Sequence, residues 1–275
     1  MGLFQHSILK KHTRQLHQRS VGRAWQVFTQ HFHNPKVQEN IRKAKEEQYQ
    51  EGFLNDLFVK VFGYTKNPAP DFNLTTELKN AKDAKKTDGA ILQLNKALAV
   101  IELKGMNTTN LNKVEPQAFG YKNNQPNCIY VITSNFRKLR FYIDNAVEFE
   151  EFDLFTLTRE RFNVLWLCLA KNSLLKGVPK QMKTESLLRE EEITQKLYND
   201  YSAFRDAMFK NLVKNNPTYD KLTLFTKTQK LLDRFLFIFF AEDRGLLPPN
   251  ISRKILSEWQ ELEELNYYQP LFQHC

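Results

Sequence analysis

Glycine, proline and cysteine are all scarce in this 275-residue chain, which has 9 glycines, 10 prolines and 3 cysteines. So few glycines and prolines exclude a collagen-like protein and a chain that is disordered throughout. Cys128, Cys168 and Cys275 lie far apart, so no pair has zinc-site spacing, and their odd number argues against a disulfide framework. A reducing compartment is therefore expected, and the sequence predicts a cytoplasmic protein.

Long hydrophobic runs are missing as well. The longest, from Phe235 to Ala241, is far shorter than the ~20 apolar residues that cross a bilayer. The amino-terminal segment also lacks the apolar stretch of a signal peptide, so no membrane partner is expected. The charge is biased instead, because 40 Lys and Arg outnumber 31 Asp and Glu and give a net charge of +9. This excess favours a polyanionic partner such as nucleic acid, although a generally basic soluble protein would show the same balance.

The spacing of apolar residues predicts helices first and strands next. Helices are expected over residues 1–34 and 37–62, and Gly63 ends the second. The pattern then alternates, and a helix is expected around residues 117–121. The predicted strands are 72–79, 90–94, 98–103, 128–133, 139–143 and 149–155. The strand at 128–133 is apolar almost throughout, which indicates that both of its faces are covered.

Helical spacing returns at residues 158–170, and no strand pattern follows it. Composition changes near residues 171–182, where Gly177 and Pro179 lie among polar side chains. Further helices are expected at about 185–215, 222–243 and 250–265. The chain therefore reads as an α/β domain over residues 1–175, with a mixed central sheet flanked by helices, and an all-helical domain over residues 176–275. The helix at 222–243 is apolar almost all round near its end, so it is expected to be buried.

Acidic and basic side chains gather at one end of the hairpin that joins strands 90–94 and 98–103. Side chains alternate along a strand, so Glu102 and Lys104 point to the same face. With a three-residue turn at 95–97, Asp88 pairs with Lys104 and shares that face. A two-residue turn would instead place Asp88 on the opposite face. The apolar pattern favours the first register, which aligns four side chains below the charges: Leu92, Leu94, Leu98 and Val100.

Two carboxylates beside an ammonium are the groups that metal-dependent phosphodiester hydrolysis needs. A divalent cation polarises the phosphoryl oxygen and lowers the pKa of its bound water. Magnesium prefers oxygen ligands and keeps several waters, so one or two carboxylates anchor it. Asp88 and Glu102 are therefore predicted as ligands of Mg²⁺, for which Mn²⁺ can substitute, and Lys104 as the residue that assists the water. A solvated sheet face with alternating Glu and Lys would carry the same triplet.

In this order and spacing, Asp88 and Glu102-Leu103-Lys104 resemble the motif of the PD-(D/E)xK nuclease superfamily, with Thr87 in place of proline. The resemblance implies a restriction-endonuclease-like fold and a Mg²⁺-dependent DNA endonuclease. It also implies that Glu51 is the acidic residue of the first core helix, which adds a metal or water contact. Glu47, one helical turn earlier, is the alternative.

A second motif strengthens the resemblance. Gln117 and Tyr121 match the Q-x-x-x-Y motif that RecB-like members of the superfamily carry on the helix after the catalytic strand. There the pair supports the site and approaches the DNA backbone, so both residues are expected to belong to the catalytic centre.

Three longer segments look like the amino-terminal part of type IIG restriction–modification enzymes: LFQHSILKKH at the start, EEQYQEGFLNDLFVKVFGY, and LLDRFLFIFFAEDRGLLPP at residues 231–249. Such enzymes join a nuclease, a helical connector, an adenine methyltransferase and a target-recognition domain. The resemblance implies a site-specific deoxyribonuclease that acts on double-stranded DNA, with residues 176–275 as the connector. The methyltransferase and target-recognition domains would be partners missing from this chain, which has no glycine-rich cofactor loop.

Two other classes of protein stay open. One is a catalytically silent DNA-binding or scaffold module that retains the nuclease fold. The other is a helical adaptor, which predicts a large exposed apolar surface on residues 222–265. For DNA binding, phosphate contacts are expected from basic clusters at residues 10–23, 79–86 and 137–140, the second containing Lys79, Lys82, Lys85 and Lys86.

Overall fold

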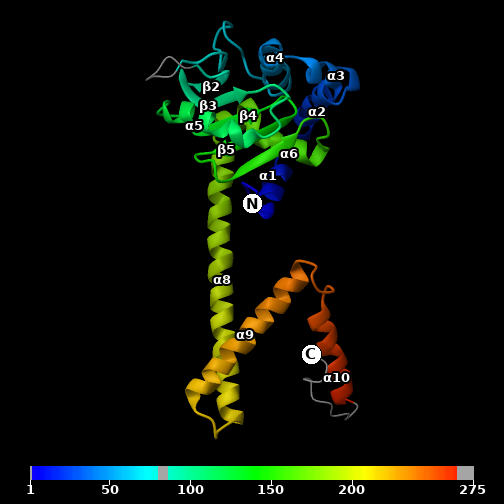
Figure 1. Ribbon diagram of the computed structural model, residues 1–275, viewed down its shortest axis with the longest axis vertical. Coiled ribbons are helices and arrows are strands. Elements are labelled where there is room, and N and C mark those ends of the chain that lie inside the picture. Colours follow the sequence, from blue (N-terminus) through cyan, green and yellow to red (C-terminus); the bar gives the residue numbers. More distant parts are fainter. Residues whose placement is uncertain (1, 80–85, 265–275) are drawn as a thin grey trace. The chain divides into compact units, whose positions relative to one another are not determined.

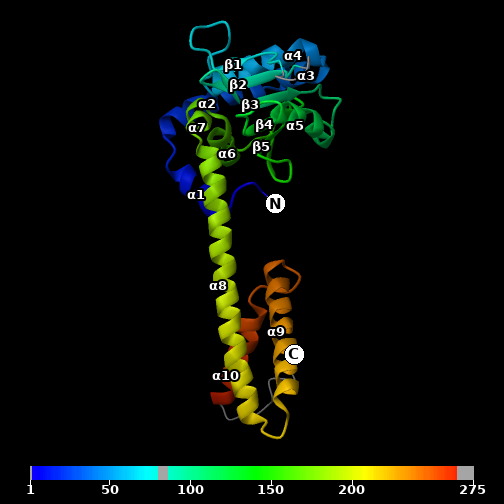
Figure 2. The same cartoon turned by 90° about the vertical axis from the view of Figure 1, so that its left-hand side faces the viewer.

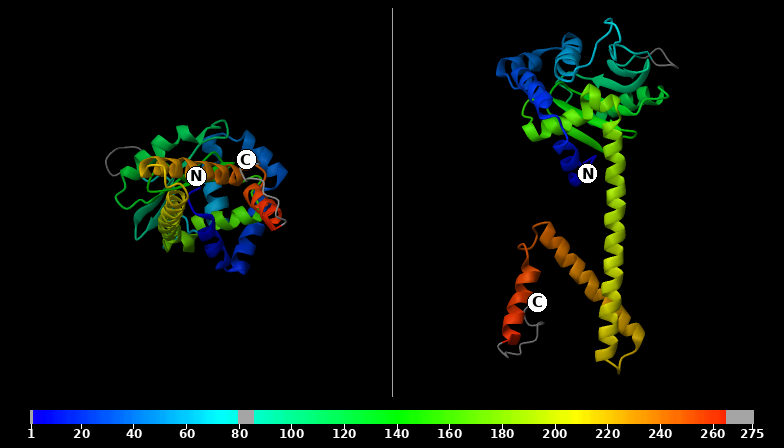
Figure 3. Two further views of the ribbon diagram at one scale, coloured as in Figure 1. Left: turned by 90° about the horizontal axis from the view of Figure 1, so that it is seen from below. Right: turned by 180° about the vertical axis from the view of Figure 1, so that it is seen from behind.

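Residues 2–79 and 86–264 are described in the structure, which is a computed structural model (Figure 1). The chain divides into two units, Met1–Glu191 and Glu192–Cys275. The sequence places a boundary earlier, near residue 175, because the polar segment there resembles a linker. In the structure that segment enters helix α8 (Val178–Asn215), which is continuous through the division (Figure 3). Pro179, Met182 and Ser186 of α8 are buried, so the start of this helix belongs to the first unit.

A six-stranded mixed sheet forms the centre of the first unit, which confirms the predicted α/β class. The strands lie in chain order, and every neighbouring pair is antiparallel except β3 and β4, which are parallel. They are β1 (Leu74–Thr75), β2 (Gly89–Gln93), β3 (Lys96–Leu103), β4 (Tyr130–Ser134), β5 (Lys138–Ile143) and β6 (Phe149–Asp153). Strand β4 is buried along its whole length, as its apolar sequence predicts. The strand expected at 72–79 is reduced to β1, since Glu77 has a φ of 54°, which breaks an extended chain.

Helices cover both faces of this sheet. Figure 2 shows α5 on one side of the strands and α6 and α7 on the other. The long helix expected at 37–62 is broken, because residues Ala44 and Lys45 are extended. The helical segments are α1 (His6–Arg14), α2 (Gln18–Phe32), α3 (Pro35–Lys43), α4 (Glu46–Phe53), the π-helical η1 (Leu54–Val61), η2 (Leu111–Lys113), α5 (Glu115–Asn123), α6 (Arg159–Leu169) and α7 (Lys171–Leu175).

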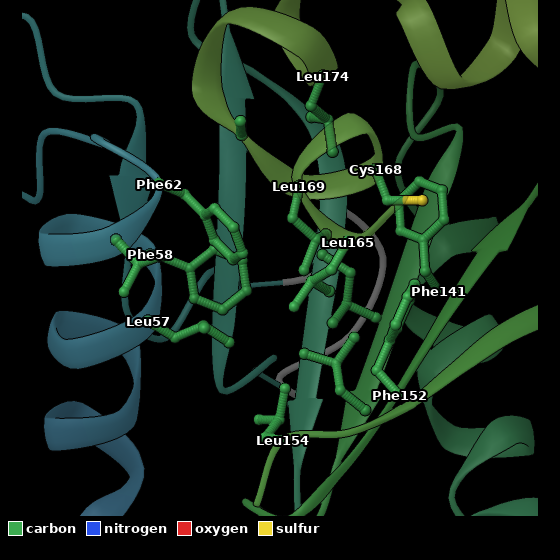
Figure 4. Close-up of a cluster of buried hydrophobic side chains, with 14 of the residues drawn as sticks. Leu57, Phe58, Phe62, Phe141, Phe152, Leu154, Leu165, Cys168, Leu169 and Leu174 are labelled. Carbon is green, nitrogen blue, oxygen red and sulfur yellow. The ribbon is translucent and has the colours of Figure 1, made fainter. Parts of the chain in front are cut away.

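Two apolar layers hold the sheet between these helices. In the larger layer, Phe58 of η1 faces Leu165 and Leu169 of α6, with Phe141 and Phe152 contributed by the sheet (Figure 4). On the opposite face, α5 packs a smaller cluster against β3, β4 and β5, formed by Val100, Ala118, Tyr121, Cys128, Val131 and Tyr142. The strand residues that follow Val100 on this second face are the charged ones, so α5 and the predicted catalytic residues share one side of the sheet.

The β2–β3 hairpin reaches the predicted arrangement by a different route. Its turn has two residues, Leu94 and Asn95, with φ angles of 49° and 60°, rather than the predicted three. A register shift at Ile91/Leu92 then leaves one residue of β3 unpaired. Because of this extra residue, Asp88 lies on the same face of the sheet as Glu102. Gly89 consequently pairs with Ile101, and continuing this register places Asp88 opposite Glu102 rather than Lys104. Leu94, expected to line the charged face, is exposed in the turn.

In the second unit, the later part of α8 packs on α9 (Lys221–Asp243) through the ring pairs Phe204–Phe235 and Phe209–Phe225. Helix α10 (Ile251–Glu264) runs in the opposite direction to α9 (Figure 3). The prediction that α9 is buried is wrong. Its buried residues are Leu224, Thr228, Leu232 and Ala241, whereas Phe237, Phe239 and Phe240 are exposed. No helix in residues 2–79 and 86–264 is long and apolar enough to cross a membrane.

Candidate active site

Asp88, Glu102 and Lys104 meet at the end of the β2–β3 hairpin that is remote from its turn. Asp88 immediately precedes β2, Glu102 is the penultimate residue of β3, and Lys104 directly follows β3. The carboxylate of Asp88 continues the strand pairing, since its Oδ2 accepts a hydrogen bond of 2.7 Å from the Leu103 backbone N–H. Its Oδ1 accepts a second hydrogen bond of 3.1 Å from Gln50 Nε2 of helix α4. Asp88 is therefore fixed from both the sheet and a helix.

The Lys104 ammonium lies between two carboxylates. Its Nζ is 2.7 Å from Glu102 Oε1 and 3.5 Å from Glu46 Oε1 of α4. The other oxygen of Glu46 accepts a hydrogen bond of 3.0 Å from the Gly105 backbone N–H. Helix α4 is thus joined to the end of β3 by a charge-assisted network that holds Lys104 beside the acidic residues.

The balance of charge in this cluster favours an additional cation. Burial, followed by the negative charge of Asp88, raises the pKa of Glu102 to about 7. Burial also raises the pKa of Asp88. Burial works to lower the pKa of Lys104, but its contacts with Glu102 and Glu46 outweigh that effect and raise it. The positive charge of Lys104 is therefore shared among the carboxylates of Glu46, Asp88 and Glu102. The pKa values of the two more buried ones, Asp88 and Glu102, are raised.

Glu102 carries the clearest mark of an incomplete site. The residue is only 1% exposed, and its Oε2 atom is buried without a hydrogen-bond partner among the described residues. Burying a carboxylate oxygen without a partner lowers the stability of the folded protein, and a cation coordinated by that oxygen would offset this loss. Within the described part of the chain, no three His, Cys, Asp or Glu side chains form a ready metal-binding group. The residues present fit a Mg²⁺ ion held by the carboxylates of Asp88 and Glu102, which leaves its other positions to water and phosphate.

The acidic residue that helix α4 contributes is Glu46. Glu51 lies elsewhere: its side chain is 75% exposed and its Oε1 is 2.5 Å from Lys66 Nζ. Glu47, the alternative, is also exposed. The helical spacing of residues 46, 50 and 54 is visible in the sequence, but only the structure shows that Leu54 is fully buried and lies against Gly89. The side of α4 that carries Glu46 and Gln50 is therefore the side that faces Lys104 and Asp88.

Replacing these two acids separately distinguishes them. Glu46→Ala is expected to lower Mn²⁺ affinity and Mg²⁺-dependent DNA cleavage by at least about tenfold, since it frees Lys104 and the Gly105 backbone. Glu51→Ala, the matched control on the same helix, is expected to stay within about twofold of wild type, because it removes only an exposed ion pair. Calorimetric titration with Mn²⁺ and initial rates of plasmid nicking measure both effects. A larger loss in the Glu51 variant would reverse this assignment.

Gln117 and Tyr121 lie on α5, one helical turn apart, and are bonded to each other by Gln117 Nε2 donating to Tyr121 Oη at 3.1 Å. Among the described residues, neither forms a hydrogen bond with Asp88, Glu102 or Lys104. Tyr121 instead packs in the cluster that contains Val100, two residues before Glu102 on the same strand face. The structure thus connects this pair to β3 by packing, while the Gln117 side chain is exposed.

The predicted phosphate-binding clusters differ in how many of their charges are free to meet DNA. Arg137 pairs with Asp153, and Arg140 pairs with Glu151 and Glu115, so the cluster at 137–140 is largely neutralised within the sheet. Lys86 pairs with Glu77, whereas Lys82 and Lys85 lie outside the described residues. In the first cluster, Lys11 pairs with Glu185, while Lys10, Arg14, Arg19 and Arg23 of α1 and α2 are exposed.

Comparison with known proteins adds no relative. No protein-family model matches the chain, and no curated protein or solved structure was found to match it.

Proposed function

We propose that the protein is a Mg²⁺-dependent DNA endonuclease of the PD-(D/E)xK type, which hydrolyses phosphodiester bonds. The observation that carries this proposal is the meeting of Asp88, Glu102 and Lys104 around a buried carboxylate oxygen that has no partner among the described residues. A solvated sheet face would leave these charges exposed and their pKa values unperturbed. Buried carboxylates with raised pKa values beside a lysine are instead typical of a catalytic centre.

Each residue of the site has a role in this proposal. Asp88 and Glu102 hold Mg²⁺, which when bound polarises the phosphate and acidifies a water molecule. Lys104 orients the attacking water and offsets negative charge that develops on the phosphate. Glu46 keeps Lys104 in place, and Gln50 with the Leu103 backbone N–H keeps Asp88 in place. The lysine therefore acts from a position set by two elements rather than from a flexible surface.

We further propose that the chain is the cleavage part of a type IIG restriction–modification system. The mixed sheet followed by long helices fits a nuclease domain and a helical connector. The exposed basic residues of α1 and α2 would contact the phosphates of double-stranded DNA. Methyltransferase and target-recognition domains would be the partners that choose the sequence to be cut.

Two measurements together test the nuclease. The purified protein is expected to bind Mn²⁺ in calorimetric titration, and to nick supercoiled plasmid DNA with Mg²⁺ but not with EDTA. Metal binding without cleavage on any DNA tested would favour the catalytically silent module. Failure to bind Mn²⁺ would contradict the proposed metal centre itself.

A second candidate function, a helical protein–protein adaptor, is favoured by the surface of the second unit. Seven large apolar side chains between residues 222 and 256 are at least 44% exposed: Leu222, Leu236, Phe237, Phe239, Phe240, Leu246 and Leu256. Exposed apolar area of this kind commonly marks an interaction surface. If association is its role, the double variant Phe237→Ser/Phe240→Ser should lose self-association or partner binding in sedimentation experiments while Mn²⁺ binding is unchanged.

A further inference from the structure

A row of polar residues crosses the sheet at the level of the candidate site. Strand pairing places Glu102 of β3 beside Thr133 of β4, Thr133 beside Arg140 of β5, and Arg140 beside Glu151 of β6. Asp88 extends this row on the other side of Glu102. Directly paired residues share a face of the sheet, and neighbouring strands are about 4.8 Å apart. The row therefore continues the acidic cluster beneath the surface, along the face that α5 covers.

Most of this row is fully paired. Arg140 Nε donates to Glu151 at 2.7 Å, and its Nη1 donates to Glu115 at 2.9 Å. The hydroxyl of Tyr142 also donates to Glu115, at 2.7 Å. Arg140, Glu151 and Glu115 are thus paired with one another, and the Arg140 guanidinium is not available to the Glu102 carboxylate.

Glu102 and Thr133 are the exceptions, and they are neighbours. Thr133 is fully buried, and its Oγ1 has no hydrogen-bond partner of normal geometry among the described residues, like Oε2 of Glu102. The Tyr142 hydroxyl lies near Thr133: the Thr133 side chain counters part of the rise that burial causes in the pKa of Tyr142, although the two hydroxyls do not form a hydrogen bond of normal geometry. A buried donor and a buried acceptor therefore occupy adjacent, paired positions on one face, and both are unsatisfied.

We propose that Thr133 is a positioning residue for Glu102, whose carboxylate its hydroxyl holds, through one buried water, in the orientation that binds the divalent cation. Through that water the hydroxyl supplies the donor that Oε2 lacks, while Lys104 bonds to Oε1. Partners of this kind around metal ligands contribute strongly to metal affinity because they restrict the ligand's orientation. The inference rests on the proposed function, since it needs Glu102 to be a metal ligand.

The test compares Thr133→Val with Thr133→Ser in the full chain, with Mn²⁺ as the probe and no DNA present. Valine keeps the shape of threonine and removes the hydroxyl, whereas serine keeps the hydroxyl. Thr133→Val is expected to bind Mn²⁺ about tenfold more weakly than wild type, and Thr133→Ser to stay within about twofold. Urea unfolding without metal provides the structural control. Thr133→Val and Thr133→Ser should both unfold in one cooperative transition, as wild type does, which would show that a weaker metal site is not the result of a disrupted fold.

Each outcome has a separate meaning. Equal Mn²⁺ affinity in wild type and Thr133→Val would overturn the positioning role and leave the nuclease proposal standing. A weakened Thr133→Val protein whose serine counterpart is equally weak would also overturn it, because the hydroxyl would then not be the cause. Wild type that binds Mn²⁺ but never cleaves DNA would overturn the nuclease alone. Wild type that binds no Mn²⁺ would overturn both.

Discussion

Replacing Lys104 by alanine is expected to abolish Mg²⁺-dependent DNA cleavage while DNA binding persists. The ammonium lies 2.7 Å from Glu102, so in the proposed site it would act on the attacking water rather than hold the DNA. Loss of a group that orients a water or moves its proton typically lowers the rate by about 10²–10⁴-fold. Initial rates on supercoiled plasmid measure cleavage, and gel-shift titration with Ca²⁺ in place of Mg²⁺ measures binding.

Lys96 provides the matched control for this variant. It lies on the same strand as Glu102, at the exposed end beside the turn, so Lys96→Ala removes one positive charge from β3 without touching the site. Its cleavage rate is expected to stay within about twofold of wild type, as for most surface substitutions. The Lys104 variant should also bind Mn²⁺ at least as tightly as wild type, since removal of the ammonium leaves the carboxylates less neutralised. Undiminished cleavage by Lys104→Ala would refute the assignment.

Glu102→Gln is expected to stabilise the metal-free protein at alkaline pH and to remove Mn²⁺ binding. The folded state raises the pKa of Glu102 to about 7 from an ordinary value of 4.5, so folded protein binds this proton more tightly than unfolded protein does. The free energy of unfolding of wild type therefore falls as the pH rises from about 4.5 through about 7. Glutamine does not titrate, so the variant lacks this loss. The difference between the two proteins should grow with pH to at most roughly 3 kcal/mol.

Urea unfolding at several pH values between 5 and 8, with EDTA, measures this difference. Glu51→Gln is the control: its carboxylate is exposed, so its profile should run parallel to that of wild type. Added Mn²⁺ should stabilise wild type at pH 8 and leave Glu102→Gln unchanged, because only the former retains the ligand. Parallel profiles for wild type and Glu102→Gln would show that Glu102 ionises normally, which is incompatible with a buried carboxylate whose pKa is raised.

The alternation of residues 98–104 was enough to predict β3 and the shared face of Glu102 and Lys104, because strand geometry repeats every two residues. Asp88 shares a face of the sheet with Glu102, as predicted, but the three-residue turn on which this prediction depended is wrong. Its position depends on two features that cancel, a two-residue turn at Leu94-Asn95 and a register shift at Ile91/Leu92. Neither feature has a distinctive local pattern in the sequence.

Residues that act from distant segments needed the tertiary structure. Glu46, Glu47 and Glu51 lie within a few residues of each other, and only the packing of Leu54 against Gly89 decides which one reaches Lys104. Similarly, the apolar sequence of α9 predicts burial, but burial depends on what covers a helix, and Phe237, Phe239 and Phe240 of α9 are exposed.

The sequence by itself determined the α/β class, the places of the strands and the residue types of the candidate site, because periodicity and side-chain chemistry are local properties. Only the tertiary structure decided that Glu46 contacts Lys104, that Gln50 bonds to Asp88, and that Thr133 lies beside Glu102 without a hydrogen bond of normal geometry among the described residues. Those relations depend on the pairing of β3 with β4 and on the packing of α4 against the sheet. Both join segments distant in the chain, so no local pattern can specify them.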